Sequence, residues 1–358
     1  MSAEIILISA LILLVLLWVF THFYLGGENL SRYDGAPETV MRPANLAPSQ
    51  GHVDALNMLN ERRKSQPKGS FREVVPTMRE TIDALGSEVP LDGVRIQPVD
   101  VDGVAAEWVL ADNADPNRRL LYLHGGGFMA GSALSHRAIT TRLAKSQGTS
   151  VLAINYRLLP EHRRMDCMAD CQTSYRWILE NGPEGTSSVK TFFAAGDSAG
   201  ALLLLALVAW ARDEGLRPVN AAVALSPPVD GTCSSKSMRE NIPTDPMLGP
   251  DFGKLMKIPR SLLLWFSLFS NRARPHEPWL SPIHGDLSNL PPILVHVSSA
   301  EMFFDDACRY VNKAKQSGTT ALLQVWPHML HVWHIFHDQV PEGDEAMLEI
   351  EKFMAANS

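Results

Sequence analysis

The sequence predicts an α/β fold: a mainly parallel, doubly wound sheet with a helical cap, preceded by one N-terminal transmembrane helix. From Pro90 onward, short apolar segments alternate with segments of helical periodicity. Before them lies a long uncharged apolar run, and an irregular insertion interrupts the alternation. Short buried strands alternating with helices of ten or more residues are typical of a parallel sheet covered on both faces. Ligands bind such sheets at the carboxyl ends of the strands, so candidate residues should follow the strands directly.

The N-terminal run from Ile5 to Leu25 contains no Lys, Arg, Asp or Glu. As a helix it would be roughly 31 Å long, about the thickness of the hydrocarbon core of a bilayer. A cleaved signal peptide is the alternative, and it would have a basic start, a shorter apolar core and small residues at the cleavage site. This run starts with MSAE and ends in bulky aromatic residues. We therefore expect residues 1–25 to be an uncleaved, single-pass membrane anchor.

The segment after the anchor indicates on which side of the membrane the catalytic domain lies. No Lys or Arg precedes the span, whereas Arg32 and Arg42 follow it, so the positive-inside rule favours a cytoplasmic catalytic domain. Residues 26–48 contain three prolines and are expected to be a linker.

Residues 49–358 are expected to form one domain. Its cap is expected to comprise residues 49–88, with two helical segments, and residues 227–282, which form the insertion. The insertion contains the apolar run from Leu262 to Phe269, LLLWFSLF, which could cover an apolar site. The net charge of −7, without a basic run interleaved with aromatics, argues against nucleic acid as a partner. The oligomeric state stays open between a monomer and a homodimer.

A serine between glycines marks one strand end. Gly196-Asp197-Ser198-Ala199-Gly200 stands between the apolar segment TFFAA and a long Ala/Leu helix. A small polar residue there can cap the helix. The Gly-x-Ser-x-Gly pattern at a strand-to-helix turn is also the nucleophile elbow of serine hydrolases. Ser198 is therefore a candidate nucleophile.

A glycine-rich turn marks a second strand end. After LLYL comes His124-Gly125-Gly126-Gly127-Phe128, about seventy residues before the serine. Successive glycines can turn bare backbone N–H groups toward a developing oxyanion. A phosphate-binding loop is disfavoured, because no Gly-Lys-Ser/Thr follows.

A serine nucleophile needs a histidine base and an orienting carboxylate. Four histidines follow the last strand: His328, His331, His334 and His337. Three carboxylates follow the strand ILVHVS: Glu301, Asp305 and Asp306. The order Ser, acid, His fits this kind of hydrolase. Glu301 lies closest to its strand end, whereas the two aspartates fit the first turn of the next helix better.

From about Val89 to its C-terminus, the chain resembles the hormone-sensitive-lipase-like esterases of the α/β-hydrolase superfamily. HGGGF and GDSAG carry the resemblance, together with GSALSHR (131–137) and YRLLPEH (156–162). The resemblance implies an α/β-hydrolase fold with Ser198 as nucleophile, His331 as base and Glu301 as acid. The family usually has an aspartate at the acid position, so Asp305 remains an alternative. The implied oxyanion hole is formed by Gly125, Gly126, Gly127 and Ala199, with the donors at the last three and Gly125 shaping the turn.

The function that the resemblance implies is hydrolysis of carboxylic esters through an acyl-enzyme, without a metal or cofactor. Short- to medium-chain acyl esters or lactones are the expected substrates, and the apolar insertion favours a small apolar or lipid-like ester. A deacetylase or amidase with the same triad is one alternative. A non-catalytic receptor for a small ligand on the same fold is another.

Overall fold

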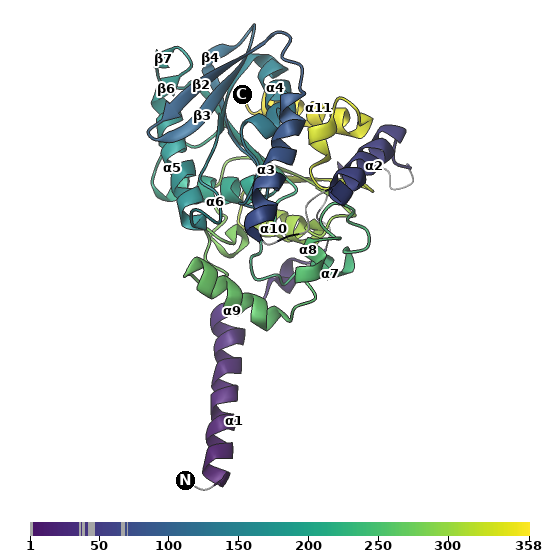
Figure 1. The fold of residues 1–358 in the computed structure, drawn as a ribbon. Helices are drawn as coiled ribbons and strands as arrows, with labels where there is room; N and C mark the ends of the chain where they lie inside the picture. The colour runs from purple at the N-terminus through teal and green to yellow at the C-terminus, as the bar shows by residue number, and fades with distance from the viewer. Residues whose placement is uncertain (1–2, 36, 38–39, 42–46, 66–68, 70) are drawn as a thin grey trace.

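A computed structural model describes residues 3–35, 37, 40–41, 47–65, 69 and 71–358 (Figure 1). Arg42, on which part of the orientation argument rests, lies outside the described residues, as does Pro43. A nine-stranded sheet forms the centre, in the order β1-β11-β10-β9-β8-β4-β5-β3-β2. The strands are β1 (Val40–Met41), β2 (Val94–Val101), β3 (Val104–Ala111), β4 (Asp115–Leu123), β5 (Thr149–Ile154), β8 (Thr191–Asp197), β9 (Ala221–Leu225), β10 (Ile293–Ser298) and β11 (Ala321–Trp326). A separate two-stranded ribbon comprises β6 (Asn181–Gly182) and β7 (Gly185–Thr186).

Most neighbouring strands of this sheet are parallel, which confirms the predicted fold class. The antiparallel exceptions are β2 with β3 and β3 with β5, at one edge. The hairpin between β2 and β3 turns through Asp102 and Gly103, both with positive φ. An Asp-Gly pair suits a two-residue hairpin, because glycine adopts positive φ without steric cost.

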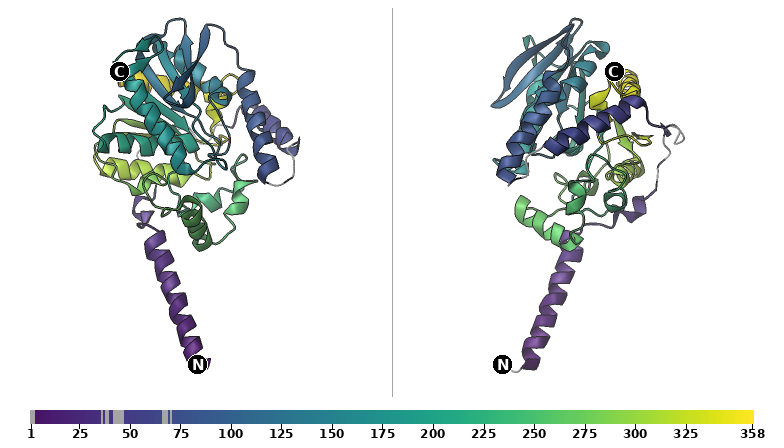
Figure 2. Two further views of the ribbon diagram at one scale, coloured as in Figure 1. Left: turned by 60° about the vertical axis from the view of Figure 1, so that its left-hand side comes forward. Right: turned by 45° about the vertical axis from the view of Figure 1, so that its right-hand side comes forward.

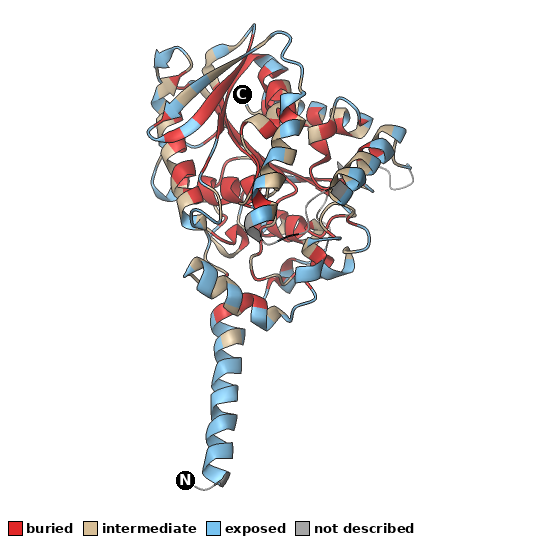
Figure 3. Cartoon of the chain, viewed as in Figure 1, coloured by how far each residue is buried: buried red, intermediate tan, exposed pale blue. Residues whose placement is uncertain are grey.

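Helices cover both faces of the sheet. On one face, α5 (Arg164–Glu180), α6 (Ala199–Asp213) and α10 (Phe304–Gln316) pack on the strands, and on the other α4 (Arg137–Lys145) and α11 (Pro341–Ala356) do so. Strands β5, β8, β9 and β10 are buried over almost their whole length, as Figure 3 shows in red. Burial on both faces explains why these strands read as continuous apolar runs instead of alternating patterns.

The segments expected to form the cap contain the helices α2 (Gln50–Ser65), α3 (Phe71–Ser87), α7 (Ser237–Glu240), α8 (Phe252–Leu255) and α9 (Arg260–Asn271). Arg79 of α3 fastens this helix to the domain. Its guanidinium donates to the carbonyl oxygens of Met129 and Leu159, at 2.7 and 2.8 Å, and pairs with Glu161 at 2.8 Å. Helix α9 lies at the end of the domain from which the N-terminal helix projects (Figure 1).

The N-terminal helix stands apart from the domain. Helix α1 (Ala3–Val19) continues into the π-helical turn η1 (Phe20–Leu25), and the helix extends away from the body in every view (Figures 1 and 2). Its apolar window has a mean hydropathy of 2.7 and is 6% buried. By length and composition it could cross a membrane, and an N-terminal signal sequence would meet the same criteria.

Residues 26–35, expected to belong to a linker, contact the domain. The short 3-10 helix η2 (Leu30–Tyr33) buries Leu30 and Tyr33. On either side of it, Glu28 pairs with Lys313 and Asp34 pairs with Arg309, each at 2.6 Å. The junction between the N-terminal helix and the domain is therefore held against α10.

Candidate active site

Ser198 lies on a sharp turn between β8 and α6. Its φ of 50° and ψ of −119° are unusual for a residue with a side chain, and such conformations typically cost about 1–3 kcal/mol. A Cβ added to Gly200 would lie 2.0 Å from the Leu123 carbonyl oxygen, so only glycine allows the helix to approach β4 this closely. The Ser198 side chain makes no capping hydrogen bond to α6. The local sequence thus builds the sharp turn expected of a nucleophile elbow, with a hydroxyl group that does not cap the helix.

Three predicted side chains meet at the carboxyl edge of the sheet. The Ser198 Oγ lies 2.8 Å from Nε2 of His331, and Nδ1 of His331 lies 2.7 Å from Oε2 of Glu301. They follow β8, β11 and β10, respectively, and both His331 and Glu301 are buried. The result is a continuous hydrogen-bonded chain from hydroxyl group to imidazole to carboxylate.

The second oxygen of Glu301 is also engaged. Its Oε1 accepts from the Ser226 hydroxyl group at 2.9 Å and from the Ser298 N–H at 2.8 Å. The carboxylate is therefore oriented on both sides and keeps Oε2 for the imidazole. Ser226, at the end of β9, is a supporting residue that the sequence reasoning missed, although a polar residue directly after a buried strand was a usable signal.

The competing candidates lie elsewhere. Asp305 accepts from the Ser237 N–H at 2.8 Å, at the start of α10. His334 contacts His296 at 3.0 Å, and His337 donates to the Ala138 carbonyl oxygen at 2.9 Å. Among the histidines after β11, His331 is the one that reaches Ser198.

Burial and pairing set the protonation of the dyad. Burial raises the pKa of Glu301, while the hydrogen bond from His331 opposes the increase. Burial alone would lower the pKa of His331, but the hydrogen bond to Glu301 and its charge outweigh it, so the pKa of His331 is raised. A raised pKa suits a group that must accept a proton from a hydroxyl group and later give it to a leaving group.

The glycine-rich turn lies beside the elbow. Gly126 and Gly127 have φ of 108° and 63°, and a Cβ on Gly126 would lie 2.1 Å from the Ala130 carbonyl oxygen. No residue that the structure describes accepts a hydrogen bond from the N–H of Gly126 or Gly127. Ala199 is the first residue of α6, where amides lack an intrahelical partner. The Gly125 N–H, in contrast, donates a hydrogen bond to the Asp197 carboxylate at 3.0 Å. It therefore holds the loop and is not available to an oxyanion.

Asp197 anchors that loop from within the elbow. Its carboxylate accepts from the Tyr122 hydroxyl group at 2.7 Å as well as from Gly125, and it pairs with His136 at 3.2 Å. Burial would raise the pKa of Asp197, but the charge of His136 outweighs this and lowers it. Burial would likewise lower the pKa of His136, and Asp197 raises it instead. The sequence reasoning assigned these three side chains no role, although Asp197 and His136 lie within GDSAG and GSALSHR.

An apolar cluster adjoins His331. The Phe303 ring lies 5.5 Å from that of His331, in an edge-on arrangement. The buried members of the cluster are Met238, Met256, Leu263, Met302 and Phe303. The insertion thus contributes Leu263 from α9, whereas Leu262, Phe266 and Phe269 of the same apolar run are exposed on the outside.

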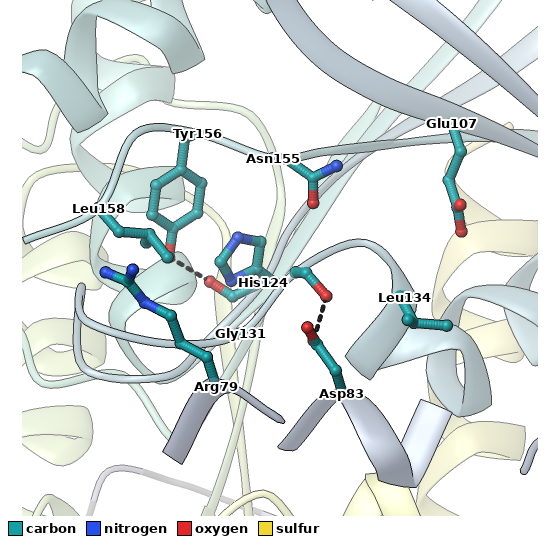
Figure 4. Close-up of a pocket in the computed structure, with 10 residues that line it drawn as sticks. Arg79, Asp83, Glu107, His124, Gly131, Leu134, Asn155, Tyr156 and Leu158 are labelled. Carbon is teal, nitrogen blue, oxygen red and sulfur yellow. Dashed lines mark hydrogen bonds between the residues drawn. The ribbon is translucent and has the colours of Figure 1, made fainter. Parts of the chain in front are cut away.

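A pocket of about 390 Å³ is lined in part by His124, the first residue of the glycine-rich motif (Figure 4). Its lining residues are Arg79, Asp83, Glu107, His124, Gly131, Ser132, Leu134, Asn155, Tyr156 and Leu158. His124 stacks on Tyr156 at 4.2 Å, and the Tyr156 hydroxyl group donates to the His124 carbonyl oxygen at 2.6 Å. Burial lowers the pKa of His124 to about 3, so the imidazole is neutral. These contacts brace the start of the turn.

In the part of the chain that the structure describes, no group of three or more His, Cys, Asp or Glu side chains is placed to hold a metal ion.

Comparison with known proteins places the chain in a family. The family described as alpha/beta hydrolase fold matches residues 120–335, more than half of the chain. An acetyl-hydrolase of Streptomyces hygroscopicus is 38% identical over 70% of this chain and 79% of its own length. The carboxylesterase/phospholipase LipF of Mycobacterium tuberculosis is 31% identical over 90% of this chain and 86% of its own.

Solved structures of esterases are also similar to this chain. The esterase EstE5, in crystals soaked with p-nitrophenyl butyrate, is 33% identical with a TM-score of 0.73, over 86% of this chain and 99% of its own. An esterase from the bacterial hormone-sensitive lipase family is 31% identical with a TM-score of 0.74, over 87% and 99% of the two chains. The chain belongs to the α/β-hydrolase family and, within it, to the hormone-sensitive-lipase-like esterases.

Proposed function

We propose that this protein is a membrane-anchored serine ester hydrolase for short- to medium-chain acyl esters or lactones. The observation that carries the proposal is the hydrogen-bonded chain from Ser198 through His331 to Glu301. It joins the three side chains needed to make and release an acyl-enzyme.

The first half-reaction acylates the serine. His331 takes the Ser198 proton at Nε2 as Oγ attacks the ester carbonyl carbon. The carbonyl oxygen becomes an oxyanion, which the N–H groups of Gly126, Gly127 and Ala199 are proposed to hold. Collapse of the tetrahedral intermediate breaks the bond to the alcohol oxygen, and His331 gives its proton to the departing alcohol.

The second half-reaction releases the acid. Water gives a proton to His331 and attacks the acyl carbon through its oxygen. Collapse breaks the bond to Oγ, and the proton returns to Ser198. Glu301 keeps the imidazole in the tautomer that accepts at Nε2 and stabilises the imidazolium in both halves.

An uncleaved anchor is the proposed role of residues 1–25, with the catalytic domain in the cytoplasm. Two contacts support the retention of this segment: Thr21 Oγ1 accepts a hydrogen bond from the Trp265 indole N–H at 2.8 Å, and the Leu25 side chain is fully buried. A signal peptide that is cut away would have no reason to pack on the mature domain.

The test is an ester panel on the full chain in detergent micelles. p-Nitrophenyl esters from acetyl to dodecanoyl, γ-butyrolactone and an acetanilide are compared, with Ser198→Ala as the matched control. Turnover of the shorter esters that is lost in Ser198→Ala supports the proposal, and preference for the acetanilide would favour an amidase. No turnover by a folded sample would contradict ester hydrolysis and favour a receptor. The name of the Streptomyces relative, acetyl-hydrolase, makes the acetyl ester the first substrate to try.

A further inference from the structure

Helix α9 exposes an apolar stripe. Leu262, Phe266 and Phe269 are 58%, 67% and 72% exposed. Spacings of four and three residues place them on one face of the helix. The opposite side is anchored in the domain by Leu263 and Leu264, both buried. Contiguous exposed apolar surface of this kind marks a contact with a partner or a membrane.

The stripe borders the point at which the N-terminal helix enters the domain. Trp265 of α9 stacks on Phe20 with ring centroids 5.3 Å apart, and its indole N–H donates to Thr21. Figure 1 shows α9 crossing the inner end of the N-terminal helix. If α1 spans a bilayer, α9 therefore lies at the depth where the span ends.

The junction gives the domain little freedom to swing away from that level. Gly27 passes so closely that an added Cβ would lie 2.7 Å from His284 and 2.8 Å from His276. The ion pairs of Glu28 and Asp34 fasten the following residues to α10. A membrane that holds α1 would therefore also meet α9.

The chemistry of α9 suits a membrane surface. The helix contains no Asp or Glu. Lys257 precedes it and Arg272 ends it, both exposed. On the N-terminal helix, Phe23 and Tyr24 are 72% and 47% exposed close to the same level. Apolar and aromatic faces with basic flanks bind at the boundary between headgroups and acyl chains.

We propose that α9 lies in the plane of the membrane surface, with Leu262, Phe266 and Phe269 inserted among the lipids. The proposal rests on the proposed membrane span of residues 1–25. Inserted in this way, α9 would fix the orientation of the catalytic domain relative to the membrane, with the insertion facing the bilayer. The inner side of α9 places Leu263 in the apolar cluster that reaches His331 through Phe303. The helix that meets the lipids would thus also pack on the cluster next to His331.

The direct test measures depth in the full chain, reconstituted in phosphatidylcholine vesicles. An NBD probe is attached at Phe269→Cys in a Cys233→Ser background, because the other three cysteines are buried. Leu348→Cys on α11, 40% exposed, is the matched control, and Leu13→Cys in α1 reports the span. Nitroxide lipids should quench the probes at positions 269 and 13 severalfold more than the probe at 348.

The outcomes separate the two proposals. Quenching at 13 without quenching at 269 would overturn the role of α9 and leave the span intact. No quenching at either position would contradict the span, and the role of α9 would fall with it. Two results together would identify a second copy as the occupant and overturn the proposal: a disulfide between the Phe269→Cys positions of two unlabelled chains, and a probe at 269 that is shielded from solvent in detergent alone.

A second readout uses substrate location. Phe266→Ser/Phe269→Ser should hydrolyse a water-soluble acetate ester within about twofold of the unsubstituted protein, since both side chains point away from the cluster. Its hydrolysis of a p-nitrophenyl ester dissolved in the vesicles should fall by about fivefold or more. If the variant hydrolysed both substrates at the rate of the unsubstituted protein, or lost the same factor on both, the insertion of α9 into the membrane would be contradicted.

Discussion

Glu301→Gln is a nearly isosteric change that should abolish most of the activity. Oε1 of Glu301 receives two hydrogen bonds, one from the Ser298 N–H at 2.8 Å. A backbone N–H can only donate, so the amide oxygen of the substituted side chain should occupy this position. The amide NH₂ then faces Nδ1 of His331 and forces that nitrogen to accept. The imidazole proton moves to Nε2, which points at Ser198 and can no longer take the serine proton.

The alternative orientation of the amide is unfavourable. It would oppose the NH₂ group to the buried Ser298 N–H, and an unsatisfied buried donor costs about 1–3 kcal/mol. In serine protease triads, the corresponding exchange of carboxylate for amide lowers kcat by about 10⁴. We expect a loss of about 10³–10⁴ in kcat, or about 4–5.5 kcal/mol at 1.36 kcal/mol per tenfold, with KM little changed.

Steady-state hydrolysis of p-nitrophenyl butyrate measures this loss. Far-UV circular dichroism and Tm check that the variant is folded. The matched control is Asp305→Asn, which should stay within about threefold of the unsubstituted enzyme because that carboxylate binds Ser237. A folded Glu301→Gln variant retaining more than about a tenth of kcat would refute the tautomer argument. A larger loss in Asp305→Asn would transfer the acid role to that residue.

Three further outcomes follow from the same geometry. His331 must be neutral to accept the serine proton, and its pKa is raised. We therefore expect kcat/KM to fall as the pH decreases, with a midpoint above about 6.5, the ordinary pKa of histidine. A midpoint at or below that value would contradict the coupling to Glu301. Gly125→Ala should lower kcat by about 10²-fold or more, because its Cβ would lie 2.1 Å from Asp197 and displace the oxyanion loop; full activity would show that the loop does not depend on this contact. Burial and the charge of Asp230 raise the pKa of Asp306 to about 8, so its contribution to stability is present at low pH and lost as the pH rises through about 8. Asp306→Asn, which mimics the protonated form, should therefore have a higher Tm than the unsubstituted protein at pH 8.5, and the difference should shrink to near zero only as the pH falls to about 4, the ordinary pKa of the unfolded carboxyl group. A lower Tm at pH 8.5 would contradict the shift.

The fold class, and the strand ends at which Ser198 and Glu301 lie, could be predicted because their signals are local. Buried strands read as apolar runs, and the nucleophile, base and acid each follow such a run. The carboxyl ends of parallel strands converge, so order along the chain was enough to nominate Ser198 and Glu301. The choice of His331 among four neighbours depended on family resemblance, since nothing in the local pattern distinguishes them.

The contacts that hold the glycine-rich loop could not be predicted, because the side chains that make them come from three segments. Tyr122 lies within β4, His136 precedes α4 and Asp197 ends β8. No periodicity signals that a buried carboxylate will meet these groups. The same reason hid the contacts of residues 26–35, whose partners Arg309 and Lys313 are more than 270 residues away in the chain.

The apolar run of α9 shows what hydrophobicity alone cannot predict about the packing of a helix. Hydrophobicity alone indicated a cover over the site, yet the helix divides its apolar residues between two faces. Leu263 and Leu264 pack inward, while Phe266 and Phe269 point outward. The sequence contains the residues for both contacts but does not tell which face meets the domain.

The most direct test of the serine mechanism is covalent labelling of the full chain with a fluorophosphonate, followed by peptide mass spectrometry. Attachment of one phosphonyl group per chain, mapped to Ser198, with esterase activity lost in proportion and labelling abolished in His331→Ala, is the predicted result. Labelling at another residue, or full activity after Ser198 is modified, would contradict the assignment of Ser198 as the nucleophile.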